Sequence, residues 1–294
     1  MKPRIELPRS FLEMPRWWHE GQAWLRALPA TTEATCRAWE LAIDGAVMHG
    51  SNAIVVPVCR DGVPLALRMA PPDERNASEV AALRFWDGRG TVRLIDADLG
   101  TGASLLERLD AGRSLSHLPL SDAIPIIGRL MRRLAVPAPL DARSTADVAR
   151  ERATTMPGEW QRLGTPFDRA TLDVAIEAAG PLSSTTSNLA VNGDLHFGQV
   201  LAGAREPWLA VDPMLLRGDI EYDLARILWA RLDEMATDAE ARRWFDVIAR
   251  EAALDPDRAR AWVLFRTADY WLWGVSWGLT EDPVRCARIV RIFR

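Results

Sequence analysis

Lysine is almost absent from this chain of 294 residues. Lys2 is the single lysine among 36 lysines and arginines, so nearly every positive charge is carried by an arginine. A mechanism that needs a buried lysine inside the fold is therefore excluded. The net charge is −4 and the arginines are dispersed. Because no basic stripe is present of the kind that follows a phosphodiester backbone, we expect no nucleic-acid partner.

Cysteine and histidine are also scarce. The three cysteines, Cys36, Cys59 and Cys286, are scattered. They lack the paired spacing of a disulfide framework or a cysteine-rich zinc site. Scattered thiols fit a reducing compartment, and we expect the protein in the cytoplasm. Histidines outside residues 191–202 are isolated from one another, so a histidine metal site is not expected.

Long apolar runs and hydrolase motifs are missing as well. No stretch approaches the ~20 apolar residues of a membrane helix. The N-terminus carries charge and proline where a secretory signal peptide needs an apolar core. We therefore expect no membrane partner. No serine lies in a G-x-S-x-G pattern, and serine hydrolase chemistry has no support.

The first third of the chain has the pattern of a small sheet. Three apolar runs predict strands, and Asp61-Gly62 predicts a hairpin turn because both residues tolerate positive φ. Two shorter apolar runs follow a second helix. The predicted strands are 39–43, 53–58, 64–69, 92–96 and 104–109, and the predicted helices are 12–28, which stops at Pro29, and 77–86.

The remainder of the chain is mainly helical. Apolar residues recur with a period of about 3.6 residues over 121–135, 145–162, 168–179, 221–236, 238–253 and 256–276. In the last of these, the tryptophan-rich face is predicted to pack in the core. We predict a strand-rich region over residues 1–105, a linker over 106–111 and a helical region over 112–294.

The segment VNGDLHFGQVLA at 191–202 interrupts this helical part. Residues 199–212 predict a β-hairpin that pairs position 199 with position 212. Asp194, Gln199 and Asp212 would then converge at its open end. Carboxylate and amide oxygens suit Mg²⁺. Gly-Asp and Asp-Pro pairs also occur in ordinary turns and strand ends, so spacing alone leaves both interpretations open.

N-G-D-L-H-F-G-Q, followed by a hairpin and V-D-P, resembles the catalytic segment of the aminoglycoside phosphotransferase family of protein-kinase-like enzymes. The flanking WLAVDPMLLRGDIEYDLARILW is similar to its streptomycin 6-kinase and hydroxyurea kinase branch. The resemblance implies a two-lobed α+β fold with an antiparallel-sheet N-lobe and a larger helical C-lobe. It also implies phosphoryl transfer from ATP or GTP, with Mg²⁺, to a hydroxyl of a small molecule, which would be an aminoglycoside-like antibiotic or a metabolite.

The resemblance assigns roles residue by residue. Asp194 would orient the acceptor hydroxyl and accept its proton, while Asp212 and Gln199 would hold Mg²⁺. In the first lobe, Ala66 would lie against the base and Arg68 would reach the phosphates. The remaining implied nucleotide contacts are Glu79, which would pair with Arg68, the loop residues Gly50 and Ser51, and the hinge backbone from Glu107 to Leu109.

The chain departs from the family pattern at three positions. Asn192 replaces a histidine, Gln199 replaces an asparagine, and Arg68 replaces the phosphate-binding lysine. A guanidinium is planar and bulkier than an ammonium, although it can bind two phosphate oxygens as a fork. A catalytically impaired nucleotide-binding pseudokinase is therefore the alternative. The presence of Asp194 and Asp212 favours an enzyme.

Three further residues are candidates for supporting or substrate-binding roles. Asp223 opens a helix, and we expect it to brace the catalytic loop together with Asn192. His196 is either a substrate contact or a structural residue. Asp269 lies on the tryptophan-rich helix, and helices of this C-terminal region wall the acceptor pocket in the related kinases. The motifs indicate shared chemistry rather than the identity of the acceptor, and no oligomeric state is predicted.

Overall fold

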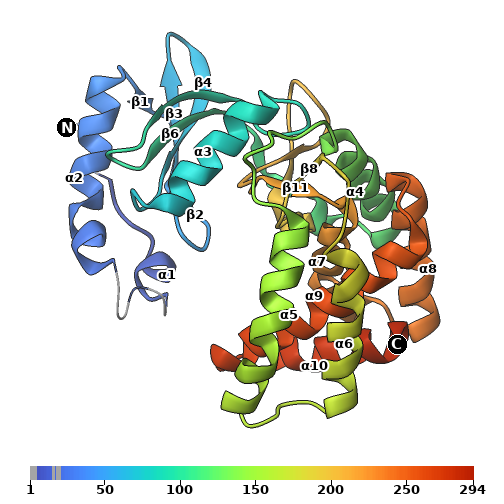
Figure 1. Ribbon diagram of the computed structural model, residues 1–294. Coiled ribbons are helices and arrows are strands. Elements are labelled where there is room, and N and C mark those ends of the chain that lie inside the picture. Colours follow the sequence, from blue (N-terminus) through green and yellow to red (C-terminus); the bar gives the residue numbers. More distant parts are fainter. Residues whose placement is uncertain (1–4, 15–16, 18–20) are drawn as a thin grey trace. The chain divides into compact units, whose positions relative to one another are not determined.

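The computed structural model describes residues 5–14, 17 and 21–294 (Figure 1). The chain forms two compact units. The first comprises Met1–Ala111 and Ala202–Pro207, and the second comprises Gly112–Leu201 and Trp208–Arg294. Helices together with antiparallel sheets make the protein an α+β fold, as the sequence predicts.

The first unit is built on an antiparallel sheet. Its strand order is β1-β3-β4-β6-β5, and β2 also pairs with β3, off this path. The elements are α1 (Arg9–Leu12), α2 (Gln22–Ala38), β1 (Ala42–Ile43), β2 (Met48–His49), β3 (Ile54–Arg60), β4 (Val63–Met69), α3 (Glu74–Trp86), β5 (Leu94–Asp98) and β6 (Ala103–Glu107).

Alternation along β4 separates a core face from a polar face. Leu65, Leu67 and Met69 pack in the same core cluster as the buried residues of α2. Since successive side chains of a strand point to opposite faces, Ala66 and Arg68 face away from that cluster. On this second face, Arg68 forms an ion pair with Glu79 of helix α3.

The predicted hairpin turn is confirmed, but the first predicted helix is wrong. Asp61 and Gly62 both have positive φ between β3 and β4. The helix predicted over 12–28 falls partly outside the described residues, and α2 continues through Pro29 to Ala38. Proline removes one helical hydrogen bond; burial of Leu25 and Leu28 against the sheet outweighs that loss. The strand predicted over 39–43 consequently shrinks to β1.

The second unit is mainly helical. The predicted helix over 145–162 is confirmed to the residue, whereas the one over 221–236 breaks into α7 and short 3-10 turns. The elements are β7 (Asp110–Ser114), which starts at the end of the first unit, α4 (Leu120–Leu134), α5 (Thr145–Arg162), α6 (Arg169–Leu182), β8 (Leu189–Val191), β9 (Val200–Ala202), β10 (Leu209–Ala210), β11 (Leu216–Gly218), α7 (Leu224–Ala230), α8 (Asp238–Ala252), α9 (Pro256–Ser276) and α10 (Glu281–Phe293).

Helix α9 is the central element of this unit. Trp262, Phe265 and Leu272 are fully buried among residues of α5 and α6, so the predicted core face is confirmed. Short strands complete the unit, β11 pairing with β8 and the order β10-β9-β7 forming a second small sheet. None of the helices in the described ranges combines the length and apolarity needed to cross a membrane.

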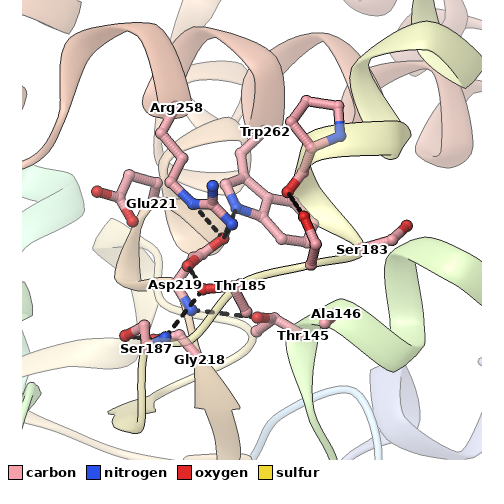
Figure 2. A network of polar contacts seen from close by, with 12 residues as sticks. Thr145, Ala146, Ser183, Thr185, Ser187, Gly218, Asp219, Glu221, Arg258 and Trp262 are labelled. Carbon is pink, nitrogen blue, oxygen red and sulfur yellow. Dashed lines mark hydrogen bonds and ion pairs between the residues drawn. The ribbon is translucent and has the colours of Figure 1, made fainter.

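Asp219 connects α9 to the β8–β11 sheet (Figure 2). Its carboxylate is 2 % exposed. It accepts hydrogen bonds from Arg258 Nε at 2.6 Å, Trp262 Nε1 at 2.8 Å and the Thr185 hydroxyl. The Asp219 backbone N–H donates to Thr145 Oγ1 at the start of α5. One buried carboxylate therefore fixes α9 relative to the strand that follows the candidate catalytic hairpin.

Replacing Asp219 with asparagine should destabilise the protein. The amide would remove the charge opposite Arg258 and turn an N–H₂ group towards existing donors, which costs about 3 kcal/mol in such buried pairs. Chemical denaturation monitored by circular dichroism measures the change.

Asp173→Asn is the matched control because it breaks an exposed pair with Arg169 on the surface of α6. Such a pair contributes less than about 1 kcal/mol. Equal stabilities of the two variants would contradict the role given to Asp219.

Candidate active site

The loop between β8 and β9 carries Asp194. Gly193 precedes it with φ of 87°, a left-handed conformation that favours glycine. Asn192 is 1 % exposed, and its Oδ1 accepts the Asp194 backbone N–H at 3.2 Å. The Gly193 N–H donates to Asp223 Oδ2 at 3.2 Å. Two buried side chains therefore hold the backbone at Gly193 and Asp194.

The Asp194 carboxylate is held by two donors. Arg226 Nε, from α7, donates to Oδ1 at 2.9 Å, and Gln199 Nε2 donates to Oδ2 at 3.2 Å. The carboxylate remains half-buried. Each carboxylate oxygen has further acceptor capacity, so both can receive another hydrogen bond.

The hairpin register differs from the prediction by one residue. Val200 pairs with Ala210 and Leu201 with Leu209, and the Val211 N–H donates to the Gln199 carbonyl. Gln199 therefore lies opposite Val211 and not Asp212. Loop geometry sets the register of a hairpin, and this loop is centred on Arg205 rather than between Arg205 and Glu206.

Asp212 nevertheless lies beside the other candidate residues. Its φ is 51°, a left-handed conformation that is uncommon for a residue other than glycine and that turns the chain just after β10. The carboxylates of Asp194 and Asp212 both act electrostatically on the His196 ring. The structure thus brings Asp194, Gln199 and Asp212 together around His196 despite the shifted register.

His196 is a neutral hydrogen-bond acceptor. Its Nδ1 accepts the Gly198 N–H at 3.2 Å, which caps the 3-10 turn Phe197–Gln199. Burial, with Arg226 adding a smaller effect, lowers the pKa of His196 to about 4. The remaining proton therefore lies on Nε2. Through this hydrogen bond His196 holds the backbone of the loop at Gly198.

Asp223 is buried beneath the loop, where burial raises its pKa to about 7. The Arg266 guanidinium and the backbone N–H groups of Gly193 and Leu195 oppose that rise. Its position matches the brace expected from the sequence.

The oxygen donors of the loop suit Mg²⁺. Gln199 Oε1 is buried without a hydrogen-bond partner, because Nε2 is the atom that turns to Asp194. An unsatisfied amide oxygen together with the Asp212 carboxylate makes a hard, oxygen-only donor set. Within the described ranges, no group of three or more His, Cys, Asp or Glu side chains is arranged to hold a metal.

The first unit contains the residues assigned to the nucleotide. Arg68 is 3 % exposed, and its Nη2 lies 2.7 Å from Glu79 Oε2 and 3.5 Å from Asn52 Oδ1. The expected ion pair with α3 is therefore present. Gly50 and Ser51 lie on a tight turn between β2 and β3, closed by a hydrogen bond from the Gly50 N–H to the Ala53 carbonyl.

Two arginines fix the segment from Glu107 to Leu109. The Glu107 backbone N–H donates a hydrogen bond to the Arg93 carbonyl. This N–H is therefore not available to bind a nucleotide base. Arg205, at the tip of the β9–β10 hairpin, binds the Glu107 carboxylate with Nε and Nη2 and also reaches the Thr91 carbonyl. Arg108 Nε donates to the Leu65 carbonyl at 2.9 Å. Side chains of both arginines therefore hold the end of β6.

Asp269 lines a pocket of the second unit. The cavity has a volume of about 340 Å³ and lies between α5 and α9. It is lined by Arg152, Glu159, Arg266, Asp269, Tyr270 and Trp273. Asp269 Oδ1 accepts from Arg152 Nε at 2.6 Å.

Sequence reasoning missed the arginines that hold these acidic groups. Arg226 and Arg205 bind carboxylates that lie 32 and 98 residues away along the chain. A local signal existed only for Arg226, which lies one helical turn after Asp223 and therefore on the same side of the helix. No local pattern indicates Arg205.

Comparison with known proteins adds independent findings. Residues 38–277 match the family model described as aminoglycoside/hydroxyurea antibiotic resistance kinase. A streptomycin 6-kinase of Streptomyces glaucescens is 38% identical over 272 residues, covering 90% of this chain and 89% of that protein. A hydroxyurea phosphotransferase of Kitasatospora aureofaciens is 37% identical over 298 residues, covering 98% of this chain and 86% of that protein.

Solved structures show the same fold. A thermostable mutant of aminoglycoside phosphotransferase APH(4)-Ia, in ternary complex with ADP and hygromycin B, aligns with a TM-score of 0.61 at 17% identity. The alignment covers 88% of this chain and 97% of that one. Choline kinase LicA from Streptococcus pneumoniae aligns with a TM-score of 0.62 at 12% identity, covering 89% and 96%.

The low pKa of His196 predicts an acid-sensitive contribution to stability. In the unfolded chain a histidine binds its proton near pH 6.5, whereas the folded ring resists protonation down to about pH 4. The unfolded state therefore gains protons first, and stability from this residue is present above pH 6.5 and lost as pH falls towards 4.

His196→Asn keeps an acceptor for the Gly198 N–H and does not titrate. We expect the stability of the native protein to fall relative to this variant, by at most about 3 kcal/mol, between pH 6.5 and 4. Urea unfolding of metal-free protein measures the difference, and His117→Asn at an exposed position is the control. An NMR titration in which the His196 ring protonates near pH 6.5 would refute the assignment.

Proposed function

The chain belongs to the aminoglycoside/hydroxyurea antibiotic resistance kinase family, which makes it a small-molecule kinase, and from this premise we propose how its residues carry out the transfer. The substrate pair is ATP with Mg²⁺ and a hydroxyl compound, and GTP is the alternative donor. The observation that carries the proposal is the half-buried Asp194 carboxylate, held by Arg226 and Gln199 beside Asp212.

Asp194 orients the acceptor hydroxyl and takes its proton. Phosphoryl transfer needs in-line positioning of the attacking oxygen more than covalent chemistry from the protein. Hydrogen bonds from Arg226 and Gln199 fix both carboxylate oxygens, so an incoming hydroxyl meets a carboxylate of defined orientation. Asn192 and Asp223 support this geometry by holding the loop backbone.

Asp212 and Gln199 hold the Mg²⁺ ion. Gln199 Oε1 supports this role because it is buried and unsatisfied in the protein alone. Bound Mg²⁺ would neutralise negative charge on the nucleotide phosphates. The longer glutamine side chain keeps its N–H₂ group on Asp194 and leaves the oxygen for the metal, which accounts for the replacement of asparagine at this position.

Arg68 binds the nucleotide phosphates in place of a lysine. Its pairing with Glu79 sets the direction of the guanidinium, and a guanidinium can hold two phosphate oxygens at once. Ala66, Gly50, Ser51 and backbone groups at the end of β6 complete the nucleotide site. The ADP and AMP-PNP complexes of structural neighbours support an adenine nucleotide.

The acceptor occupies the pocket between α5 and α9, with Asp269 in its wall. We place the reaction in the cytoplasm, in keeping with scattered cysteines. The alternative of an inactive nucleotide-binding protein gains no support from the relatives, whose names are those of kinases and a phosphotransferase.

Asp194→Asn should remove turnover and keep nucleotide binding. Loss of the proton acceptor costs roughly 10²- to 10⁴-fold in kcat, whereas ATP with Mg²⁺ should still raise the melting temperature by mass action. Nucleotide binding is measured by thermal shift with ATP, ADP and GTP, with and without Mg²⁺. Turnover is measured by an acceptor screen that detects ADP release. Native-level turnover by the variant would reject Asp194 as the base.

Glu79→Gln should weaken nucleotide binding more than it slows transfer. Without its ionic partner, Arg68 loses its fixed direction, and KM for ATP should rise about tenfold, equivalent to ~1.4 kcal/mol. Glu74→Gln, at an exposed position of the same helix, is the matched control. An unchanged KM in Glu79→Gln would show that the pair does not serve the nucleotide.

A further inference from the structure

A series of contacts connects the pocket between α5 and α9 to the candidate base. Arg226, which donates to Asp194, lies over the Trp229 ring at 5.9 Å. Trp229 stacks on Tyr270 at 4.4 Å and 8°. Tyr270 is one of the residues that line the cavity. A continuous series of contacts within the second unit therefore leads from the Asp194 carboxylate to the wall of the pocket.

Both carboxylates of the pocket are occupied by one arginine. Arg152 Nε donates to Asp269 Oδ1 at 2.6 Å, and its Nη2 donates to Glu159 Oε2 at 2.6 Å. Burial alone would lower the pKa of the Arg152 guanidinium, but the two acidic neighbours raise it above its ordinary value. The three groups form a compact ionic cluster whose acidic members already have a cationic partner.

A second cation faces the same cavity. Arg266 donates to the Tyr222 hydroxyl and lies over the Tyr222 ring at 3.9 Å. The buried carboxyl near it is Asp223, whose pKa burial raises to about 7. The formal charges of the lining residues, two arginines and two acids, cancel. The cavity therefore presents no surplus negative charge to a cation.

Two stacked aromatic rings form part of the pocket wall. Tyr270 stacks on Trp273 at 5.1 Å and 20°, and Trp273 is 45 % exposed. The cavity volume of about 340 Å³ is at the lower end of the range for small-molecule sites. An aromatic face can attract a cation, but Arg152 and Arg266 repel one at the same place. These features suit a small polar compound without positive charge.

We infer that the acceptor is an uncharged hydroxyl compound rather than a polycationic aminoglycoside, because Arg152 occupies both acidic groups of the pocket. This inference rests on the proposed kinase function and adds the substrate class. Sequence identity does not decide the matter, since the streptomycin 6-kinase and the hydroxyurea phosphotransferase are 38% and 37% identical to the chain. Streptomycin carries guanidinium groups, whereas hydroxyurea is uncharged.

The test compares hydroxyurea with streptomycin as acceptors for the full-length protein with ATP and Mg²⁺. ADP release gives the rates, and mass spectrometry identifies the phosphorylated product. We expect kcat/KM for hydroxyurea to exceed that for streptomycin by at least about tenfold. A preference for streptomycin, or equal values, would overturn the inference and leave the kinase function intact.

Turnover of neither compound would also overturn the inference. Nucleotide binding separates this result from failure of the proposed function. Stabilisation by ATP with Mg²⁺ and no turnover would reject only the acceptor class tested. If nucleotide and Mg²⁺ also failed to stabilise the protein, the kinase function itself would be rejected.

Arg152→Gln tests the physical cause directly. Removing the guanidinium releases Asp269 and Glu159 for a cationic acceptor, so KM for streptomycin should fall about tenfold relative to KM for hydroxyurea. Arg152→Lys keeps the positive charge and should retain the native preference. Arg162→Gln removes the same charge from an exposed position of α5 and is the matched control.

Thermal melting of each variant separates this effect from loss of folding. A folded Arg152→Gln protein with the native acceptor preference would refute the role of Arg152. If the Arg162→Gln control showed the same change in KM for streptomycin relative to hydroxyurea, net charge alone would explain the change. That result would also overturn the inference.

Discussion

The active-site proposal depends on how the Asp194 carboxylate is held. Arg226 binds one oxygen and Gln199 the other, while Asn192 and Asp223 bind the backbone around it. Gln199 and Asn192 come from the segment between β8 and β9, whereas Arg226 and Asp223 come from the start of α7. This segment and the helix must therefore pack correctly before the carboxylate has a fixed direction. Asp219 contributes to that packing by joining α9 to the strand that follows the hairpin.

Arginine supplies nearly all the positive charges of this protein. Arg68 pairs with Glu79, Arg205 with Glu107, and Arg258 with Asp219. A guanidinium stays charged at every physiological pH and can bind several acceptors in one plane, so one side chain can join segments distant in sequence. The same property is seen in the pocket between α5 and α9, where Arg152 pairs with two acids, and the proposed acceptor class rests on that pairing.

The sequence predicted the family, the α+β fold and the elements whose signals are local. The β3–β4 turn follows from Asp61-Gly62, and the core face of α9 follows from its apolar period. Predictions failed where distant packing decides the outcome. Pro29 lies inside α2 because the helix is buried against the sheet, and the hairpin register depends on a loop whose Arg205 contacts Glu107. The roles of Arg226 and Arg152 depend on partners that are close only in the folded chain.

A crystal structure with AMP-PNP and Mn²⁺ in place of Mg²⁺ would test the central claim most directly, because the anomalous signal of manganese locates the metal without ambiguity. The account predicts a metal bound by Gln199 Oε1 and the Asp212 carboxylate, with Asp194 outside the coordination shell and still hydrogen-bonded to Arg226. A metal held by other residues, with Gln199 Oε1 making no contact to it, would contradict the account.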